Sequence, residues 1–112
     1  MYKKATSPSL FGRRLREARN RIGIAQDKLG VVIGMDESCS SARISRYETG
    51  THEPPIATAG KLAMALKVPL AFFYCEDDRL AEILIHYAVL SNDQRSQLLE
   101  YVIEMNAESK AK

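Results

Sequence analysis

Apolar residues recur every three or four positions along most of the chain, with polar residues between them. In residues 9–22 the apolar positions are Leu10, Phe11, Leu15, Ala18 and Ile22. This spacing gathers them on one face of an α-helix. No stretch alternates apolar and polar residues over a useful length, so the pattern predicts an all-α fold.

Residues with strong preferences for helix ends divide the rest of the chain into further helices. Ser7 and Pro8 are suited to open the first helix, and Gly23 is suited to close it. We expect later helices at residues 26–33, 57–66 and 70–74, from 76–78 onward, and after the capping-box sequence at 91–94.

The third helix follows a longer connection than the others. Residues 35–39 are polar and are predicted to form a turn. Ser40 or Ser41 can then cap a short helix that Gly50 ends. Two short helices in series, followed after a turn by a helix rich in Ser and Arg, have the layout of a helix-turn-helix.

The charge is uneven along the chain, although the net charge is only +2. Residues 1–50 hold ten Lys or Arg against five Asp or Glu, whereas residues 51–112 hold six against nine. This asymmetry favours a polyanion at the N-terminal part and a different partner at the C-terminal part.

Several classes of protein do not fit the sequence. No apolar run approaches the ~18 residues of a membrane span and no secretory leader is expected, so we predict a cytoplasmic protein without membrane contact. Cys39 and Cys75 share no ligand spacing with His52 or His86, which predicts free thiols and no metal site or cofactor. No catalytic triad, carboxylate dyad or phosphate-cradling glycine loop is visible, which argues against an enzyme.

The order of particular residues within this layout resembles a known family. The residues that carry the match are Arg19, Gly23, Ile24, Gln26, Leu29, Gly34, Ile44, Ser45, Arg46, Tyr47, Glu48, Gly50 and Pro54. With residues 61–63 and 66–73 they resemble the phage-repressor and Cro-like (XRE) helix-turn-helix family over roughly residues 10–73. The resemblance implies a five-helix lambda-repressor-like domain at 9–75, after a flexible basic tail at 1–8, with double-stranded DNA as its partner.

The resemblance also implies roles for particular residues. The positions expected at the DNA are Gln26, Ser40, Ser41, Ala42, Arg43, Ser45, Arg46, Thr49 and Thr51. Gln26 would bind a backbone phosphate, and the third helix would lie in the major groove. Arg46 is our first choice for a bidentate contact with guanine and Arg43 the second, although either can hold phosphate instead. Arg19 and Glu48 resemble a partly buried structural ion pair.

The sequence departs from the family where the third helix begins. Gly34 and Glu48 are separated by roughly four residues more than in the family, and we place the surplus in the turn at 35–39, looping away from the DNA. The alternative is an insert that contacts DNA or a partner. Asp36 and Glu37 would bring negative charge close to the phosphate backbone.

Other basic and acidic residues have two interpretations. Glu53 stands where the family is often basic, which weakens a phosphate clamp in the loop after the third helix. Lys3, Lys4, Arg13 and Arg14 are either additional phosphate contacts or a solvated surface.

Residues 76–108 lie outside the resemblance and contain two amphipathic helices, before an expected tail at 109–112. Their apolar positions are Leu80, Ile83, Leu84, Tyr87, Leu98, Leu99, Val102 and Ile103. These side chains either pack back on the five-helix domain or pair with a second copy, and we favour pairing. A two-fold homodimer would place two third helices ~34 Å apart and would bind a palindromic site.

Two functions from different classes fit these observations. The first is a sequence-specific transcriptional regulator, in its simplest form a repressor that occupies its operator as a dimer. The second is an antitoxin-like protein whose acidic C-terminal helices hold a basic protein partner, with DNA binding secondary. Copurification of an unrelated small protein would distinguish the second from the first.

Overall fold

The computed structural model describes residues 9–111 and is helical throughout, so the expected all-α fold is confirmed. The predicted cap at Ser7 and Pro8 and the predicted basic tail lie outside these residues. The elements are α1 (Leu10–Ile22), α2 (Gln26–Val32), α3 (Glu37–Thr49), α4 (Ile56–Leu66), the 3-10 helix η2 (Leu70–Tyr74), α5 (Asp78–Tyr87) and α6 (Asn92–Ala111).

Capping side chains explain where several of these helices begin. The Ser9 hydroxyl accepts a hydrogen bond from the N–H of Gly12 (2.9 Å) and so caps α1. The predicted capping box before α6 is confirmed: the N–H of Gln94 donates to Ser91 Oγ (3.1 Å), and the N–H of Ser91 donates to Gln94 Oε1 (2.9 Å). These reciprocal bonds cap the start of α6 where the sequence had located it, whereas α1 is capped by Ser9 and not by the expected Ser7.

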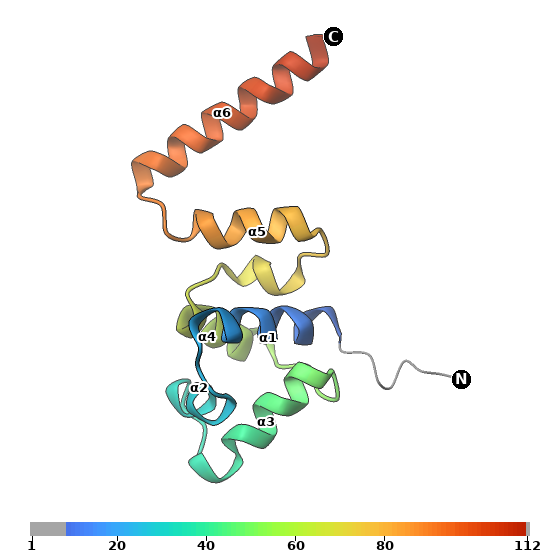
Figure 1. Cartoon of the computed structure of the whole chain (residues 1–112), viewed down its shortest axis with the longest axis vertical. Coiled ribbons are helices and arrows are strands. Elements are labelled where there is room, and N and C mark those ends of the chain that lie inside the picture. The colour runs from blue at the N-terminus through green and yellow to red at the C-terminus, as the bar shows by residue number, and fades with distance from the viewer. Residues whose placement is uncertain (1–8, 112) are drawn as a thin grey trace, which may run out of the picture.

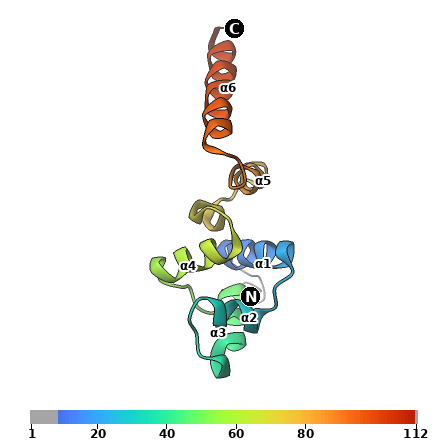
Figure 2. The same ribbon diagram turned by 90° about the vertical axis from the view of Figure 1, so that its left-hand side faces the viewer.

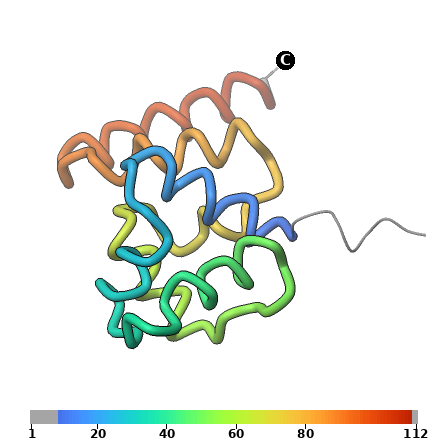
Figure 3. Tube along the Cα trace, turned by 60° about the horizontal axis from the view of Figure 1, so that its bottom comes forward, coloured from blue at the N-terminus to red at the C-terminus, as the bar shows by residue number. Residues whose placement is uncertain are grey.

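The core lies around α1, which is sandwiched between α3 on one side and η2 with α5 on the other (Figures 1 and 3). Phe11 of α1 packs against Phe73 of η2, with the rings tilted and their centroids 4.8 Å apart. Leu15, Leu29, Ile44 and Leu62 fill the centre and are fully buried. Burying a side chain of this size contributes about 1.5–3 kcal/mol, so these residues fix how the first four helices pack.

The two C-terminal helices differ in how they relate to this core. α5 packs against it through Ala81, which is buried, and through Leu84 and Ile85, which are half-buried. Of the two alternatives left open for residues 76–108, packing back on the domain is seen for α5, where Leu84 is partly used within the domain. Packing back occurs for α5 alone.

α6 contacts the end of α5 through Arg95, which donates to the carbonyl oxygens of Tyr87 and Ala88, and then projects away from the rest of the molecule (Figures 1 and 2). It lengthens the molecule to 56 Å and raises the radius of gyration to 16.8 Å, against about 13 Å for a compact chain of this length. The helix continues to Ala111, so the predicted tail at 109–112 is helical over most of its length. No helix in residues 10–111 combines the length and apolar character needed to cross a membrane.

Candidate nucleic-acid interface

The turn between α1 and α2 is fixed by Gly23 and Arg19. Gly23 has a φ of 74°, in the left-handed region, and its N–H donates to the carbonyl oxygens of Arg19 and Asn20. Nη1 of Arg19 donates to the carbonyl oxygen of Ile24 (3.0 Å). These contacts place Gln26 at the first position of α2, as expected.

α2 and α3 pack closely at Gly30, the glycine of α2. A Cβ atom on Gly30 would overlap the hydroxyl of Ser40, which faces it from α3. The Ser40 hydroxyl donates to the carbonyl oxygen of Asp27, and its side chain is completely buried. The structure therefore corrects the expected role of Ser40: it joins α3 to α2 and has no surface to offer to DNA.

A buried carboxylate ties the first three helices together. Glu48 of α3 is 1% exposed and accepts hydrogen bonds from Nε of Arg19 (2.6 Å), Nε of Arg16 (3.3 Å) and Nε2 of Gln26 (3.0 Å). The expected ion pair between Arg19 and Glu48 is thus confirmed, and it is the centre of a larger network. Because each donor comes from α1 or α2, the network fixes the orientation of α3.

The ionisation of Glu48 follows from these partners. Burial alone would raise the pKa of its carboxyl group, but the hydrogen bonds from Arg19 and Gln26 and the charge of Arg19 outweigh it. The pKa is held below the usual range for glutamate. The carboxylate therefore remains charged, and the network intact, throughout the neutral range.

α3 is one turn longer than the sequence interpretation placed it. It begins at Glu37 after Asp36, and neither Ser40 nor Ser41 caps it. The surplus residues assigned to an outward loop at 35–39 are mostly helical instead. An acidic residue in the first turn interacts favourably with the positive end of the helix dipole, which explains why Glu37 can start the helix.

The exposed face of α3 lies opposite this buried network. Ser41, Ala42, Arg43 and Arg46 are exposed on it, and Ser45 is half-buried. Of the residues predicted from sequence, these five are brought together on one helix surface. The face is made of small side chains beside two arginines, a composition that allows close approach to a base-pair edge and supplies hydrogen-bond donors.

The loop after α3 continues this surface. Thr49 and Thr51 are both exposed, and their hydroxyl oxygens are 3.0 Å apart. The N–H of His52 donates to the carbonyl oxygen of Arg46 (3.2 Å), which folds the loop back over the helix end. Both threonines therefore lie at the C-terminal end of the α3 face.

Ser38 was missed by the sequence interpretation. It is exposed in the first turn of α3, and helical spacing places it on the same side as Ala42, Ser45 and Thr49. Its hydroxyl donates to the Asp36 carboxylate. The acidic residues at 36 and 37 suit the start of a helix, and with the helix begun there Ser38 would have been placed on this face.

Arg14 was weighed from sequence as a phosphate contact, and the structure corrects this. Its side chain is 3% exposed and faces the C-terminal half of the chain, whereas Arg13 and Arg16 are exposed. Burial removes Arg14 from any DNA-facing surface.

The helices and contacts described above match a known family over more than half of the chain. The family model described as helix-turn-helix (HTH_3) matches residues 15–73, which include α2, α3 and the Glu48 network. The chain belongs to this helix-turn-helix family. The resemblance to the XRE branch inferred from sequence is confirmed.

The relatives agree with this assignment. The chain is 32% identical over 63 residues to uncharacterised HTH-type transcriptional regulators of Sinorhizobium medicae (strain WSM419) and Rhizobium meliloti (strain 1021). The match covers 56% of this chain and 42% of each relative, so the chain spans less than half the length of these relatives.

A solved structure is similar over most of the chain. The crystal structure of the transcriptional regulator BswR matches with a TM-score of 0.81 and 39% identity, covering 87% of this chain and 96% of BswR. A match to 87% of the 112 residues leaves only about 15 residues unmatched, so more than half of the 39 residues after residue 73 are included. The likeness therefore continues beyond the helix-turn-helix into the C-terminal helices.

Proposed function

We propose that the protein is a transcriptional regulator that binds double-stranded DNA sequence-specifically as a homodimer and acts as a repressor at a palindromic operator. α3 is the recognition helix in this proposal and enters the major groove. The observation that carries it is the exposed α3 face, held rigidly by the buried Glu48 network, in a chain whose relatives are named as regulators.

Arg46 is the residue to which we assign base recognition. It is exposed in the last turn of α3, and none of the described residues forms an ion pair with it. A free guanidinium can donate two parallel hydrogen bonds to guanine, with a discrimination of about 1–3 kcal/mol. Arg43 is assigned to phosphate or to a second base contact.

Gln26 is assigned to a backbone phosphate. Its amide nitrogen donates one hydrogen bond to Glu48, and an amide has a second N–H. Phosphate oxygens accept and do not donate hydrogen bonds, so this second N–H is the group that fits them. The residue would then connect the phosphate contact to the network that orients α3.

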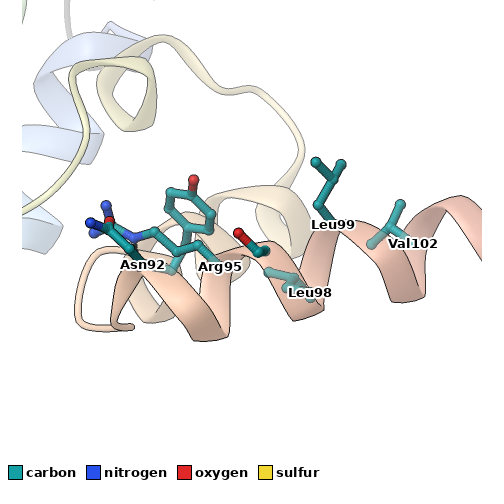
Figure 4. A pocket seen from close by; sticks show the side chains of 7 residues that line it. Asn92, Arg95, Leu98, Leu99 and Val102 are labelled. Carbon is teal, nitrogen blue, oxygen red and sulfur yellow. Dashed lines mark hydrogen bonds between the residues drawn. The ribbon is translucent and has the colours of Figure 1, made fainter.

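Dimerisation is assigned to the apolar surface of α5 and α6. Its exposed members are Leu80, Ile83, Tyr87, Leu99, Tyr101, Val102, Ile103 and Met105. A groove of about 520 Å³ lies between the end of α5 and α6, and Leu99 and Val102 project along it (Figure 4). Roughly half of each of these eight side chains is exposed, so covering them contributes roughly 6–12 kcal/mol per copy.

The arrangement of apolar residues on α6 favours a second copy as the cover. At 3.6 residues per turn, the positions from Tyr101 through Leu98 and Val102 to Ile103 span about 200° of the helix. One neighbouring helix covers only about half of such an arc. In a two-fold dimer α6 can contact both α5 and α6 of the other copy, which covers the whole arc.

A second candidate function rests on the opposite side of α6. Asp93, Glu100, Glu104 and Glu108 are exposed there, so the helix presents acidic and apolar surfaces together. Such a helix fits a basic protein partner, as in an antitoxin-like protein. Purification from cells that express the chain at native level, followed by mass spectrometry, tests this: a stoichiometric basic partner would favour the second function.

Selection from a randomised duplex pool at physiological salt tests the first function, because salt suppresses non-specific phosphate binding. Enrichment of two inverted half-sites about one helical turn apart is the expected result. Enrichment of single half-sites would contradict the dimer, and no enrichment would contradict sequence-specific DNA binding.

A further inference from the structure

A single buried arginine joins α1 to the C-terminal helices. Nε of Arg14 donates to the carbonyl oxygen of Cys75 (2.9 Å), and Nη2 donates to the carbonyl oxygen of Glu76 (3.3 Å) and to Oδ1 of Asp78 (2.9 Å). Nη1 donates to Oε1 of Glu17 (3.0 Å). These partners include two of the three residues that connect η2 to α5 and the first residue of α5.

The guanidinium group of Arg14 also contacts an aromatic ring through its flat face. Its guanidinium carbon lies 5.7 Å from the centroid of the Phe72 ring. Four of the five N–H groups of a guanidinium can thus be matched to acceptors, while the planar group rests over an aromatic side chain. A planar group bound in this way allows little rotation of the segment that it holds.

α1 therefore holds two parts of the molecule with two sets of arginines. Arg16 and Arg19 bind Glu48 and so hold α3, whereas Arg14 binds the start of α5. The figures place α1 between these two parts (Figures 1 and 3). The position of α5 relative to α3 is therefore set by their contacts with the same helix, α1.

We propose that Arg14 is a positioning residue that sets the spacing of DNA half-sites which the dimer accepts. The proposal rests on the dimeric DNA-binding function proposed above. α5 and α6 join the two copies, so the angle at which α5 leaves α1 determines the distance between the two α3 helices. Arg14 fixes this angle without contacting DNA.

Arg13 provides a matched control. It is the neighbouring residue on α1 and contacts the same two carboxylates at longer distances, Asp78 at 3.4 Å and Glu17 at 3.5 Å. It donates to neither the Cys75 nor the Glu76 carbonyl, and its side chain is 44% exposed. Arg13→Met removes the same charge from the same helix and leaves the connection to α5 held.

The test compares the wild type, Arg14→Met and Arg13→Met on duplexes with the half-sites that the wild type selects. One duplex has the selected spacing, a second has two base pairs inserted, which rotates one half-site by about 70°, and a third has a single half-site. Binding is measured by fluorescence anisotropy, and circular dichroism confirms that each variant is folded.

The wild type and Arg13→Met are expected to bind the selected spacing about tenfold more tightly than the lengthened one. Arg14→Met is expected to reduce this preference to about threefold or less while its affinity for the single half-site is retained. A folded Arg14→Met protein with the full preference overturns the proposal, as does an equal loss in Arg13→Met.

If Arg14→Met does not fold, Arg14→Lys decides the question. Lysine keeps the positive charge but cannot match the four acceptors that the guanidinium group binds. An unchanged spacing preference in this variant overturns the proposal. If the protein does not bind DNA as a dimer, the selection with the wild type will already yield DNA without paired half-sites. That result is distinct from a failure of the role proposed for Arg14.

Discussion

The segment from α1 to η2 and the helix α6 use apolar and charged residues in opposite ways. In the first, large apolar side chains are buried and the buried charges of Arg14 and Glu48 are matched by partners. In α6, every side chain from Leu99 to Lys110 is exposed, including Tyr101 and Met105. The first buries most of its large apolar side chains within one copy of the chain, although Val32 and Met64 remain exposed, whereas the apolar side chains of α6 after Leu98 are uncovered among the described residues.

This difference suggests that the segment from α1 to η2 stabilises the fold and that α6 serves association. Isolated helices are marginal in water, and an apolar face is the usual source of their stability in proteins. In α6 the apolar face is left uncovered by the other described residues. Changes in the first segment should therefore alter the stability of the fold, and changes in α6 should alter association.

The largest effect is expected at the centre of the packed segment. Glu48→Gln removes the charge that Arg19 and Arg16 face and leaves Arg19, whose side chain is only 15% exposed, without its counter-charge, which costs about 3 kcal/mol in the free energy of unfolding. Urea denaturation monitored by circular dichroism measures this. Glu82→Gln changes an exposed carboxylate that pairs with His86 and, among residues 9–111, with no other side chain, and should change stability by less than about 0.5 kcal/mol. Equal effects for both would remove the distinction drawn here.

A substitution on the apolar face of α6 should act on association and not on the stability of the fold. Val102→Glu places a carboxylate on the apolar arc, and we expect the dimer dissociation constant to rise about 100-fold, or about 2.7 kcal/mol. Sedimentation velocity measures it, with Glu104→Gln on the opposite face as a control that should not weaken the dimer. A Val102→Glu protein that dimerises like the wild type would show that α6 does not join the copies.

Two glycines should respond with opposite signs. A Cβ atom on Gly12 would overlap the backbone carbonyl oxygen of Glu48, so Gly12→Ala should destabilise the fold by about 1–3 kcal/mol. Gly60 lies in α4 with nothing near its missing Cβ, so Gly60→Ala should stabilise by about 0.4–1 kcal/mol. Thermal unfolding decides both signs, and a stable Gly12→Ala protein would show that α1 and α3 pack less closely than described.

On DNA, Arg46→Ala should lower the affinity for the selected site by about 1–3 kcal/mol and relax the base preference at one position. Gln26→Ala should weaken binding to selected and unrelated duplexes alike, since a phosphate contact carries no sequence information. Competition binding with single-base variants of the site distinguishes these patterns. Uniform loss for both variants would contradict base recognition by Arg46.

The smallest expected effect is a dependence of stability on pH. The pKa of Glu48 is lowered in the folded state, so its contribution is complete above the ordinary range near pH 4.3 and is lost as the pH falls through the lowered value. The stability difference between the wild type and Glu48→Gln should therefore narrow below about pH 4. A difference that stays constant down to pH 2 would mean that the carboxylate is not what stabilises the network.

Local sequence signals predicted much of the fold. The ends of α1 and α3 follow from Gly23 and Gly50, and the start of α6 follows from the capping box at 91–94. The pair of Arg19 and Glu48 followed from family resemblance. Each of these depends on residues within one or two helical turns or on a known motif.

Predictions were wrong where distant contacts decide the outcome. Ser40 has the side chain of a helix cap, but the close approach of Gly30 buries it in the interior of α3. Arg14 has the spacing of a solvated helix face, but the carbonyl groups of Cys75 and Glu76 hold it inside. A single sequence contains no signal for partners more than sixty positions away.

The mass of the protein bound to its selected duplex tests the central claim most directly, namely that α3 binds DNA while α5 and α6 join two copies. Light scattering coupled to size-exclusion chromatography at physiological salt gives this mass. Two chains of 12.5 kDa on each duplex with paired half-sites is the predicted result. One chain per duplex at saturation would contradict the account, because the apolar surface of α6 would then serve some purpose other than pairing.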